Sequence, residues 1–298
     1  MTDILIERHG GAQVLRFNRA AKKNAITQAM YTALAQGIAA GEADGSIGAH
    51  VFMGSGGIFS AGSDLKDFLS RGLFDPGTAP VAQFLGALVR AHKPLIAAVD
   101  GAAIGIGTTM LLHCDLVYAS QAAQLSTPFL DLGVVPEAAS SLLLPQRSGH
   151  NIAFEMLCLG EKLDAQRALK AGLINAILPP EQLEAHALAA AQKLAAKPRE
   201  ALTVSRRLMR GDPAAIHARM LEEFKHFEAQ LKSPEAQEAI AAFLEKRPPD
   251  FAKARTQVER GAPAGCFNCA NLSGLSGRAP PERESPCAGK ANELFLSP

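Results

Sequence analysis

The sequence predicts an α/β protein with a spiral or doubly wound core, followed by a helical C-terminal third. Two stretches of the chain each pass from a buried strand into a glycine-rich loop and then into a helix, which is the order expected of an α/β core. From Pro180 onward, Ala, Leu, Glu, Lys and Arg dominate and follow helical spacing. Hydrophobic residues make up 48% of the 298 residues, which is enough to fill a sizeable core.

The N-terminal residues predict a hairpin followed by a helix. Apolar strands are expected at Ile4–Glu7 and Val14–Phe17, joined through two glycines. Thr27 has the character of an N-cap, since a hydroxyl side chain can accept a hydrogen bond from a free amide of the first helical turn. The helix is expected to continue to about Ala43, on the spacing of Met30, Leu34 and Ile38.

The first strand, loop and helix unit follows directly. Val51–Met53 is a short buried strand that leads into the glycine-rich segment Gly54–Leu65. A helix is expected over Val81–His92, because the Lys-Pro step after it disfavours further helix.

The second unit repeats this order. Leu95–Val99 is a fully apolar strand, Asp100–Gly107 is a second glycine-shaped turn, and a helix extends from it to Leu112. A further strand is expected at Asp115–Ala119.

The composition changes twice towards the C-terminus. Prolines at 198, 213 and 234 divide the helical stretch, and beyond residue 250 the chain becomes rich in Gly, Pro, Ser and Asn. We therefore divide the chain into a core (1–197), a C-terminal helical region (198–250) and a tail that we expect to be disordered (251–298).

Charge and cysteine usage exclude several classes of protein. Because 30 Lys and Arg residues balance 29 Asp and Glu residues, no global field attracts nucleic acid or an anionic membrane. The apolar stretch 95–112 is interrupted by Asp100 and several glycines, so we predict no membrane span. The odd number of five cysteines favours a reducing compartment. Cys266 and Cys269 have the spacing of zinc ligands, but only Cys287 could join them and no nearby His supplies a fourth ligand, so we predict no metal site.

Four segments resemble the crotonase (enoyl-CoA hydratase/isomerase) superfamily: Lys93–Gly107, Phe59–Leu65, Asn18–Ala25 and Cys114-Asp115. The resemblance covers roughly residues 3 to 250. It implies a spiral of ββα units with a C-terminal helical region that builds trimers. It also implies an acyl-CoA substrate, a homotrimer or dimer of trimers, and no cofactor, since coenzyme A enters as the substrate thioester.

The two glycine loops have a physical role that fits this resemblance. A thioester carbonyl that gains negative charge needs preorganised N–H donors, and glycine-rich turns let backbone amides approach it closely. One donor is expected to be the amide of Ser63, and the family pattern gives the amide of Ile106, after Gly105, as the other. The alternative is that these glycines only allow tight packing. Many crotonases have Gly where Ile106 stands and Asn where Asp100 stands; we have no account of Asp100.

The resemblance also implies a coenzyme A site around the first loop. Backbone groups of Ala61, Gly62, Ser63, Asp64 and Leu65 would hold the adenine, and Lys22, Lys23 and Lys66 are candidates for the phosphates. The alternative for the lysines is that they are ordinary solvated charges. Asp64 is expected to fix its own loop by accepting hydrogen bonds from local amides.

The two glutamates of crotonase hydratases are absent. Thr109 and Phe129 stand at the two positions, and neither side chain can transfer a proton at neutral pH. Instead, Ser126–Ser141 is similar to Δ3,Δ2-enoyl-CoA isomerases of the peroxisomal type, and this likeness implies that Glu137 is the base. Glu137 follows an apolar run and is expected at the start of the next helix, where partial dehydration would raise its pKa.

Other assignments of the base stay open at this point. Glu137 could instead satisfy free amides at the N-terminus of that helix. Asp131 is the rival base, whereas His92, His113 and His150 fall in or beside helices and are expected to be packed or solvated.

The resemblance implies a proton shuttle. Glu137 would remove a proton from C2 of a 3-enoyl-CoA and return it at C4, while Phe129 would exclude water and suppress hydration. The alternatives are another crotonase-type acyl-CoA enzyme, such as an atypical hydratase, and a non-catalytic acyl-CoA- or RNA-binding relative. With no Trp and two Tyr, the sequence disfavours RNA binding. The chain does not end in Ser-Lys-Leu, so the expected location is the cytoplasm.

Overall fold

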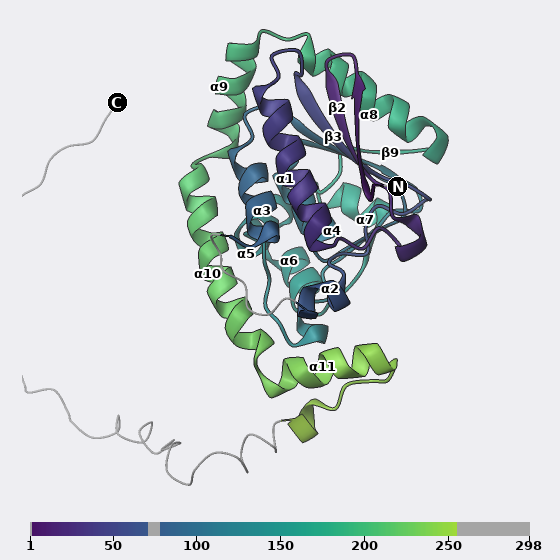
Figure 1. Ribbon diagram of the computed structural model, residues 1–298, viewed down its shortest axis with the longest axis vertical. Helices are drawn as coiled ribbons and strands as arrows, with labels where there is room; N and C mark the ends of the chain where they lie inside the picture. Colours follow the sequence, from purple (N-terminus) through teal and green to yellow (C-terminus); the bar gives the residue numbers. More distant parts are fainter. Residues whose placement is uncertain (1, 71–77, 255–298) are drawn as a thin grey trace, which may run out of the picture. The chain divides into compact units, whose positions relative to one another are not determined.

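The computed structural model describes residues 2–70 and 78–254, which build a larger and a smaller sheet with surrounding helices (Figure 1). In the larger sheet the strand order is β1-β2-β3-β4-β6-β9. The pair β1 and β2 is the predicted antiparallel hairpin, and every other pair in this sheet is parallel. The bounds are Ile4–His9 for β1, Ala12–Phe17 for β2, Ala49–Gly54 for β3, Leu95–Val99 for β4, Leu116–Ser120 for β6 and Ala176–Leu178 for β9.

Three short strands form the second sheet, in the order β5-β7-β8, with bounds Ala102–Ile104, Gln124–Ser126 and Leu163–Asp164. The chain therefore places β4 in the larger sheet and β5 in the smaller one, then repeats this with β6 and β7. This alternation is the spiral. The sequence predicts only a turn at 100–107 and does not predict β5, because three residues are too few to show a strand period.

Both faces of the larger sheet are buried, which explains its apolar strands. Helices α1 (Gln28–Ala43) and α3 (Pro80–Arg90) cover one face, and α8 (Pro180–Ala195) covers the other (Figure 1). Along β3, Phe52 contributes to the core under α1 and α3, whereas Val51 and Met53 contribute to the core under α8. Successive side chains of a strand point to opposite faces, so each face receives every second residue.

The remaining helices lie in the loops and in the C-terminal region. Thr27 is confirmed as the cap of α1, because its Oγ1 accepts a hydrogen bond from the amide of Met30 (3.3 Å). Helices α8 to α11 form the predicted C-terminal helical stretch, and the last two start at the predicted breaks Pro213 and Pro234. The bounds are Leu65–Ser70 for α2, Ile106–Thr109 for α4, Ser140–Ser148 for α5, His150–Leu157 for α6, Ala165–Lys170 for α7, Arg199–Arg210 for α9, Pro213–Leu231 for α10 and Pro234–Glu245 for α11.

Two predictions concern the C-terminal tail and membrane-spanning segments. Residues 251–254 are helical and Ala254 is buried, so the expectation of disorder from residue 251 is wrong for these four residues. Residues 255–298, with the cysteine pair at 266 and 269, lie outside the described residues. Within the described ranges, no helix has both the length and the apolar character that a membrane crossing requires.

Candidate active site

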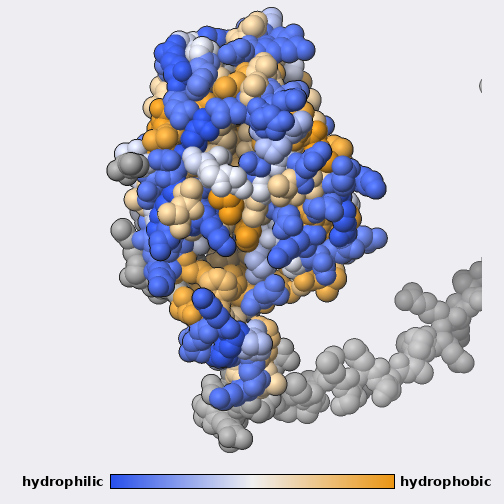
Figure 2. All heavy atoms as spheres, turned by 90° about the vertical axis from the view of Figure 1, so that its right-hand side faces the viewer, coloured by the Kyte–Doolittle hydropathy of each residue, from blue (hydrophilic) through white to orange (hydrophobic). Residues whose placement is uncertain are grey.

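A largely apolar cavity of about 190 Å³ lies where the two glycine loops meet the C-terminal helices. Figure 2 shows one face of the molecule on which hydrophobic residues gather between hydrophilic ones. Among the residues predicted to belong to the site, eight line the cavity: Ala61, Gly62, Ser63, Leu65, Gly105, Ile106, Phe129 and Glu137.

The two glycine loops are held together by backbone hydrogen bonds. The amide of Ser60 donates to the carbonyl of Ala102 (3.0 Å), and the amide of Ile104 donates to the carbonyl of Ser60 (2.9 Å). The buried side chain of Asn24 supports the first loop by donating to the carbonyls of Ser55 (3.0 Å) and Ile58 (2.8 Å). The segment around Asn24, one of the four that resemble the crotonase family, therefore stabilises this loop through hydrogen bonds.

Glycine is required where these loops touch. A Cβ atom at Gly62, whose φ is +86°, would lie 2.8 Å from the carbonyl oxygen of Ile104. A Cβ at Gly107 would lie 2.9 Å from the carbonyl oxygen of Ser60. Since real side chains do not tolerate such contacts with a backbone atom, the missing side chains allow the loops to approach closely.

The close approach leaves two amides without backbone partners. Within the described part of the chain, neither the Ser63 nor the Ile106 amide donates to a backbone carbonyl. Ile106 is the first residue of α4, where free N–H groups are intrinsic to the helix start. The Ser63 hydroxyl lies 2.7 Å from the hydroxyl of the fully buried Tyr31. Both amides thus belong to residues that line the cavity, as a site for a developing oxyanion requires.

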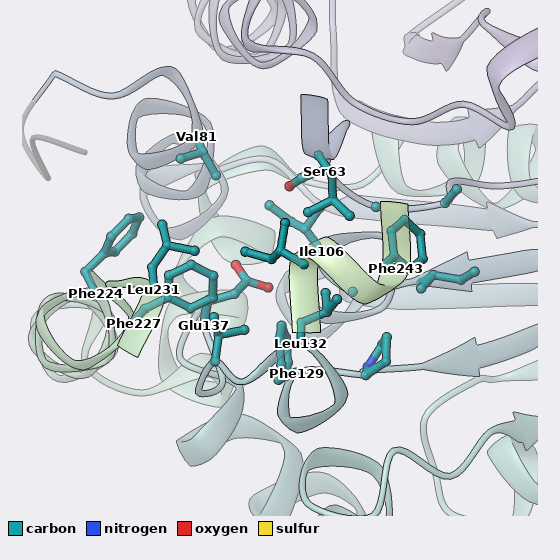
Figure 3. A pocket seen from close by; sticks show the side chains of 18 residues that line it. Ser63, Val81, Ile106, Phe129, Leu132, Glu137, Phe224, Phe227, Leu231 and Phe243 are labelled. Carbon is teal, nitrogen blue, oxygen red and sulfur yellow. The ribbon is translucent and has the colours of Figure 1, made fainter. Parts of the chain in front are cut away.

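Glu137 faces these loops across the cavity. Figure 3 shows its carboxylate directed towards Ile106, with the Phe129 ring nearby. Thr109 of α4 donates a hydrogen bond from its hydroxyl to Oε1 of Glu137 (2.5 Å). The sequence does not predict this contact, because Thr109 stands out there only as the replacement of a glutamate.

Burial dominates the acid–base behaviour of Glu137. It raises the pKa of the carboxyl to about 8, the Thr109 hydrogen bond opposes this rise, and the negative charge of Glu223 adds to it. A carboxyl that is half ionised near pH 8 can accept and return a proton at physiological pH. Among the described residues lining the cavity, Glu137 is the only one with an ionisable side chain.

Helices α10 and α11 close the far side of the cavity. Figure 3 shows Phe224, Phe227 and Leu231 of α10 on one side of Glu137 and Phe243 of α11 on the other. Ile240 of α11 also lines the cavity. The sequence predicts these helices but not their contact with the site, because helical spacing identifies an apolar face without identifying what it packs against.

The other predicted site residues lie outside the cavity lining. Asp64 bonds the guanidinium of Arg19 through Oδ2 (2.8 Å) and accepts from the amide of Asp67 (3.2 Å), which matches its expected role in fixing the loop. Lys22, Lys23 and Lys66 are exposed around the first loop. The rival base Asp131 and two of the histidines, His92 and His150, are exposed as well.

The local position of Glu137 differs from the prediction. Glu137 precedes α5 by three residues, and its carboxylate accepts a hydrogen bond from Thr109. Only its backbone carbonyl accepts from the first amide of α5, that of Ser140 (3.0 Å). The amides on either side are satisfied by Glu223 of α10, which accepts from Ala139 (2.6 Å) and Ser141 (2.9 Å). The helix-capping role considered for Glu137 therefore belongs to Glu223, which sequence reasoning missed because the two segments lie far apart in the chain.

Comparisons with known proteins agree with this geometry. Residues 7–254 match the family model described as enoyl-CoA hydratase/isomerase. The chain is similar to enoyl-CoA delta isomerase 2 of Rattus norvegicus, at 34% identity over 82% of this chain but only 64% of the relative's length. It is similar to 2,3-dehydroadipyl-CoA hydratase of Escherichia coli, at 32% identity over 84% of this chain and 99% of the relative.

A solved crotonase structure matches the fold closely. The crystal structure of an enoyl-CoA hydratase/isomerase from Pseudoalteromonas atlantica has a TM-score of 0.80 and 39% identity, covering 84% of this chain and 100% of that one. The alternating strands, the C-terminal helices and the paired glycine loops are thus those of the crotonase fold. The chain belongs to the enoyl-CoA hydratase/isomerase family and is an enzyme of that family.

Proposed function

We propose that the protein is a Δ3,Δ2-enoyl-CoA isomerase, which converts a 3-enoyl-CoA into the 2-trans-enoyl-CoA in fatty-acid or related acyl-CoA metabolism. The observation that supports this choice best is the presence of one ionisable group, Glu137, among the described residues that line the cavity. Hydration needs a positioned water with acid and base partners, whereas moving a double bond needs one base that takes and returns a proton.

The proposed reaction has two steps. The Glu137 carboxylate removes a proton from C2, and the electrons form a dienolate whose oxygen accepts hydrogen bonds from the Ser63 and Ile106 amides. The protonated carboxyl then gives the proton to C4, and the double bond moves from C3–C4 to C2–C3. Glu137 ends in its starting ionisation state, so the cycle closes without another reactant.

The surroundings of Glu137 suit this cycle. A pKa of about 8 makes its carboxylate a stronger base than an ordinary glutamate and keeps its acid form accessible. Phe129, which is 6% exposed and lines the cavity, places an aromatic ring where the resemblance puts an acid in hydratases. An apolar ring in this place disfavours a bound water that could add to the product.

The proposal includes the binding mode and the assembly. Coenzyme A enters as the substrate thioester, with the backbone of residues 61–65 at the adenine and Lys22, Lys23 or Lys66 at the phosphates, and no cofactor is needed. We also propose a homotrimer or dimer of trimers in the cytoplasm, consistent with the exposure of Leu208 (75%) and Met209 (79%) on α9. Light scattering on the purified protein tests the assembly.

Product analysis tests the proposed reaction. The protein is incubated separately with 3-hexenoyl-CoA and 2-trans-hexenoyl-CoA, and products are followed by mass and ultraviolet absorbance. The first substrate is expected to give the 2-trans isomer without the mass of an added water. Glu137→Gln is expected to lower this rate by about 10²- to 10⁴-fold, the usual contribution of a general base.

Asp131→Asn serves as the control, because it removes the rival carboxylate while leaving the cavity lining intact. It is expected to isomerise at nearly the wild-type rate. Rapid hydration of the 2-trans substrate by the wild type, or full isomerase activity in Glu137→Gln, would contradict the proposed function.

A further inference from the structure

The backbone directly after Glu137 adopts a conformation that its residues disfavour. Ala138 and Ala139 both have positive φ, at 60° and 55°, although neither is glycine. The left-handed conformation costs roughly 1–2 kcal/mol for each residue with a Cβ atom. Two such residues in succession persist only where surrounding contacts hold them, so the contacts of this turn determine where Glu137 points.

Glu223 supplies the most extensive of these contacts. Its carboxylate accepts hydrogen bonds from the Ala139 amide (2.6 Å), the Ser141 amide (2.9 Å) and the Ser141 hydroxyl (2.5 Å). Helix α5 has no capping side chain of its own, because alanine occupies its N-cap position. Glu223 therefore caps α5 from another helix, at a separation of 84 residues from Ala139.

His113 holds the same turn through another backbone group. Its Nε2 donates to the carbonyl of Ala138 (2.9 Å), and the residue is fully buried. Burial lowers the pKa of His113 to about 3, so the ring is neutral and Nε2 carries its single proton. The turn is thus held by a neutral donor at the Ala138 carbonyl and by a carboxylate at the Ala139 and Ser141 amides.

Glu223 also belongs to the helix that shapes the acyl cavity. The next residue, Phe224, lines that cavity, as does Phe227 one turn further along α10. Glu223 itself is 5% exposed, and its carboxylate is directed away from solvent into the turn. Helix α10 therefore contributes apolar side chains to the cavity wall and a carboxylate to the backbone turn that follows Glu137.

We propose that Glu223 is a positioning residue, which holds the turn after Glu137 and so fixes the Glu137 carboxylate relative to the cavity wall formed by the same helix. This proposal rests on the proposed role of Glu137 as the base. Glu223 acts through the backbone of residues 139–141 and does not touch the cavity.

Charge gives this arrangement a measurable signature. Burial is the largest cause of the raised pKa of Glu137; the Thr109 hydrogen bond opposes it and the negative charge of Glu223 adds to it. Burial also raises the pKa of Glu223, whereas its hydrogen bonds to Ser141 and Ala139 and the charge of Arg219 on α10 lower it. Two further described groups face this region, the neutral ring of His113 and the buried hydroxyl of Tyr31 on α1. Removing the charge of Glu223 is therefore expected to lower the pKa of Glu137. Water that enters a loosened site would lower this pKa as well, so a variant that keeps the charge is needed to separate the two effects.

The test compares Glu223→Gln and Glu223→Asp with a control on the same helix. Glu228→Gln also removes a negative charge from α10. Glu228, however, forms an ion pair with Lys232 and does not contact the turn after Glu137. The pH profiles of kcat and of KM are measured separately with 3-hexenoyl-CoA. In parallel, the pKa of Glu137 is measured by carbon-13 NMR of glutamate-labelled protein, with the signal assigned from Glu137→Gln.

Glu223→Gln is expected to lower kcat by about 10- to 100-fold, the loss typical of a misplaced catalytic group, with little change in KM. Its rise in kcat with pH and the NMR titration of Glu137 are both expected at lower pH than in the wild type. Glu223→Asp keeps the charge but shortens the side chain, so it is expected to keep a nearly wild-type titration with an intermediate kcat. Glu228→Gln is expected to behave as wild type.

An unchanged kcat and an unchanged Glu137 titration in a folded Glu223→Gln protein would overturn the proposal. If Glu223→Gln does not fold, Ser141→Ala removes one of the three hydrogen bonds and is expected to lower kcat by a smaller factor. A wild type that does not isomerise would refute the proposed function instead. The NMR titration would still decide whether Glu223 governs Glu137, so the two failures are distinguishable.

Discussion

Two features of the site act in opposite directions on the pKa of Glu137. Its apolar surroundings disfavour the ionised form, whereas the hydroxyl of Thr109 stabilises it through a short hydrogen bond. The presence of Glu137 in the cavity lining could be predicted, because the segment around it resembles that of the isomerases; its role as the base is our proposal. The contact with Thr109 could not, since Thr109 and Glu137 meet only through the packing of α4 beside the turn before α5.

The pKa of Glu137 predicts the pH dependence of the reaction. The base is active when ionised, so kcat is expected to rise as pH increases through about 8 and to level off above it. An ordinary glutamate would give a rise near pH 4.5. Steady-state rates between pH 5 and 10, at saturating 3-enoyl-CoA, measure this directly, and a profile that is already flat at pH 6 would contradict the assigned pKa.

Thr109→Val tests the hydrogen bond on the same carboxyl. Valine keeps the shape of the side chain but cannot donate, so the ionised form loses its stabilising partner and the pKa of Glu137 is expected to rise further. The rise in kcat should then move to higher pH, opposite to the shift expected for Glu223→Gln. A shift to lower pH would show that the hydroxyl does not favour the carboxylate.

The two glycine loops are joined into one structural unit by backbone pairing. The strands before them could be predicted from their apolar runs, and the helix after the second loop from its glycine-shaped start. The contact between the loops follows from the pairing of residues 60 and 103, which carries no local sequence signal. The positions of the Ser63 and Ile106 amides therefore depend on glycines that belong to both loops.

Gly107→Ala tests this dependence. The added methyl group would lie 2.9 Å from the Ser60 carbonyl oxygen, so one loop must move and the Ile106 amide with it. We expect kcat to fall by about 10²- to 10³-fold, as for loss of one oxyanion donor, and the free energy of unfolding to decrease by about 1–3 kcal/mol. Both are measured, by steady-state kinetics and by denaturant unfolding.

Gly86→Ala is the matched control for Gly107→Ala. Gly86 also lies in a helix, α3, but the nearest atoms to an added Cβ there belong to the flexible end of the Arg90 side chain. Its kcat is expected to stay near the wild-type value. A wild-type kcat in Gly107→Ala would show that the oxyanion donors do not depend on this contact.

The C-terminal helices supply one wall of a site whose other wall is built by loops of the core. Helices α10 and α11 contribute Phe224, Phe227, Leu231, Ile240 and Phe243 to the cavity. The sequence predicts that these helices exist but not that they meet residues more than eighty positions earlier. If the acyl chain binds here as proposed, their apolar faces remove it from water and leave it no cationic partner among the described residues of the lining.

This lining predicts selection between acyl groups. The Escherichia coli relative is named for 2,3-dehydroadipyl-CoA, whose acyl group ends in a carboxylate. In the present cavity such a carboxylate would be buried without a cation, at a cost of several kcal/mol. We expect kcat/KM for a 3-enoyl-CoA with a terminal carboxylate to be at least ~100-fold below that for the methyl-terminated analogue.

Leu231→Arg supplies the missing cation within the lining and is expected to narrow this difference. The two substrates are compared at equal chain length by steady-state kinetics. Equal kcat/KM values in the wild type would show that the end of the acyl chain does not enter the apolar part of the cavity.

The solitary position of Glu137 in the cavity lining has a consequence for isotopic labels. With no second ionisable group among the described lining residues, a proton taken from C2 has no other lining side chain to move to and stays on Glu137 until it returns to carbon or exchanges with solvent. A deuterium placed at C2 is therefore expected to reappear at C4 of the same molecule, on the same face of the chain. The fraction of deuterium retained in the product, measured by mass spectrometry, reports how often the deuteron returns to carbon before it exchanges with water.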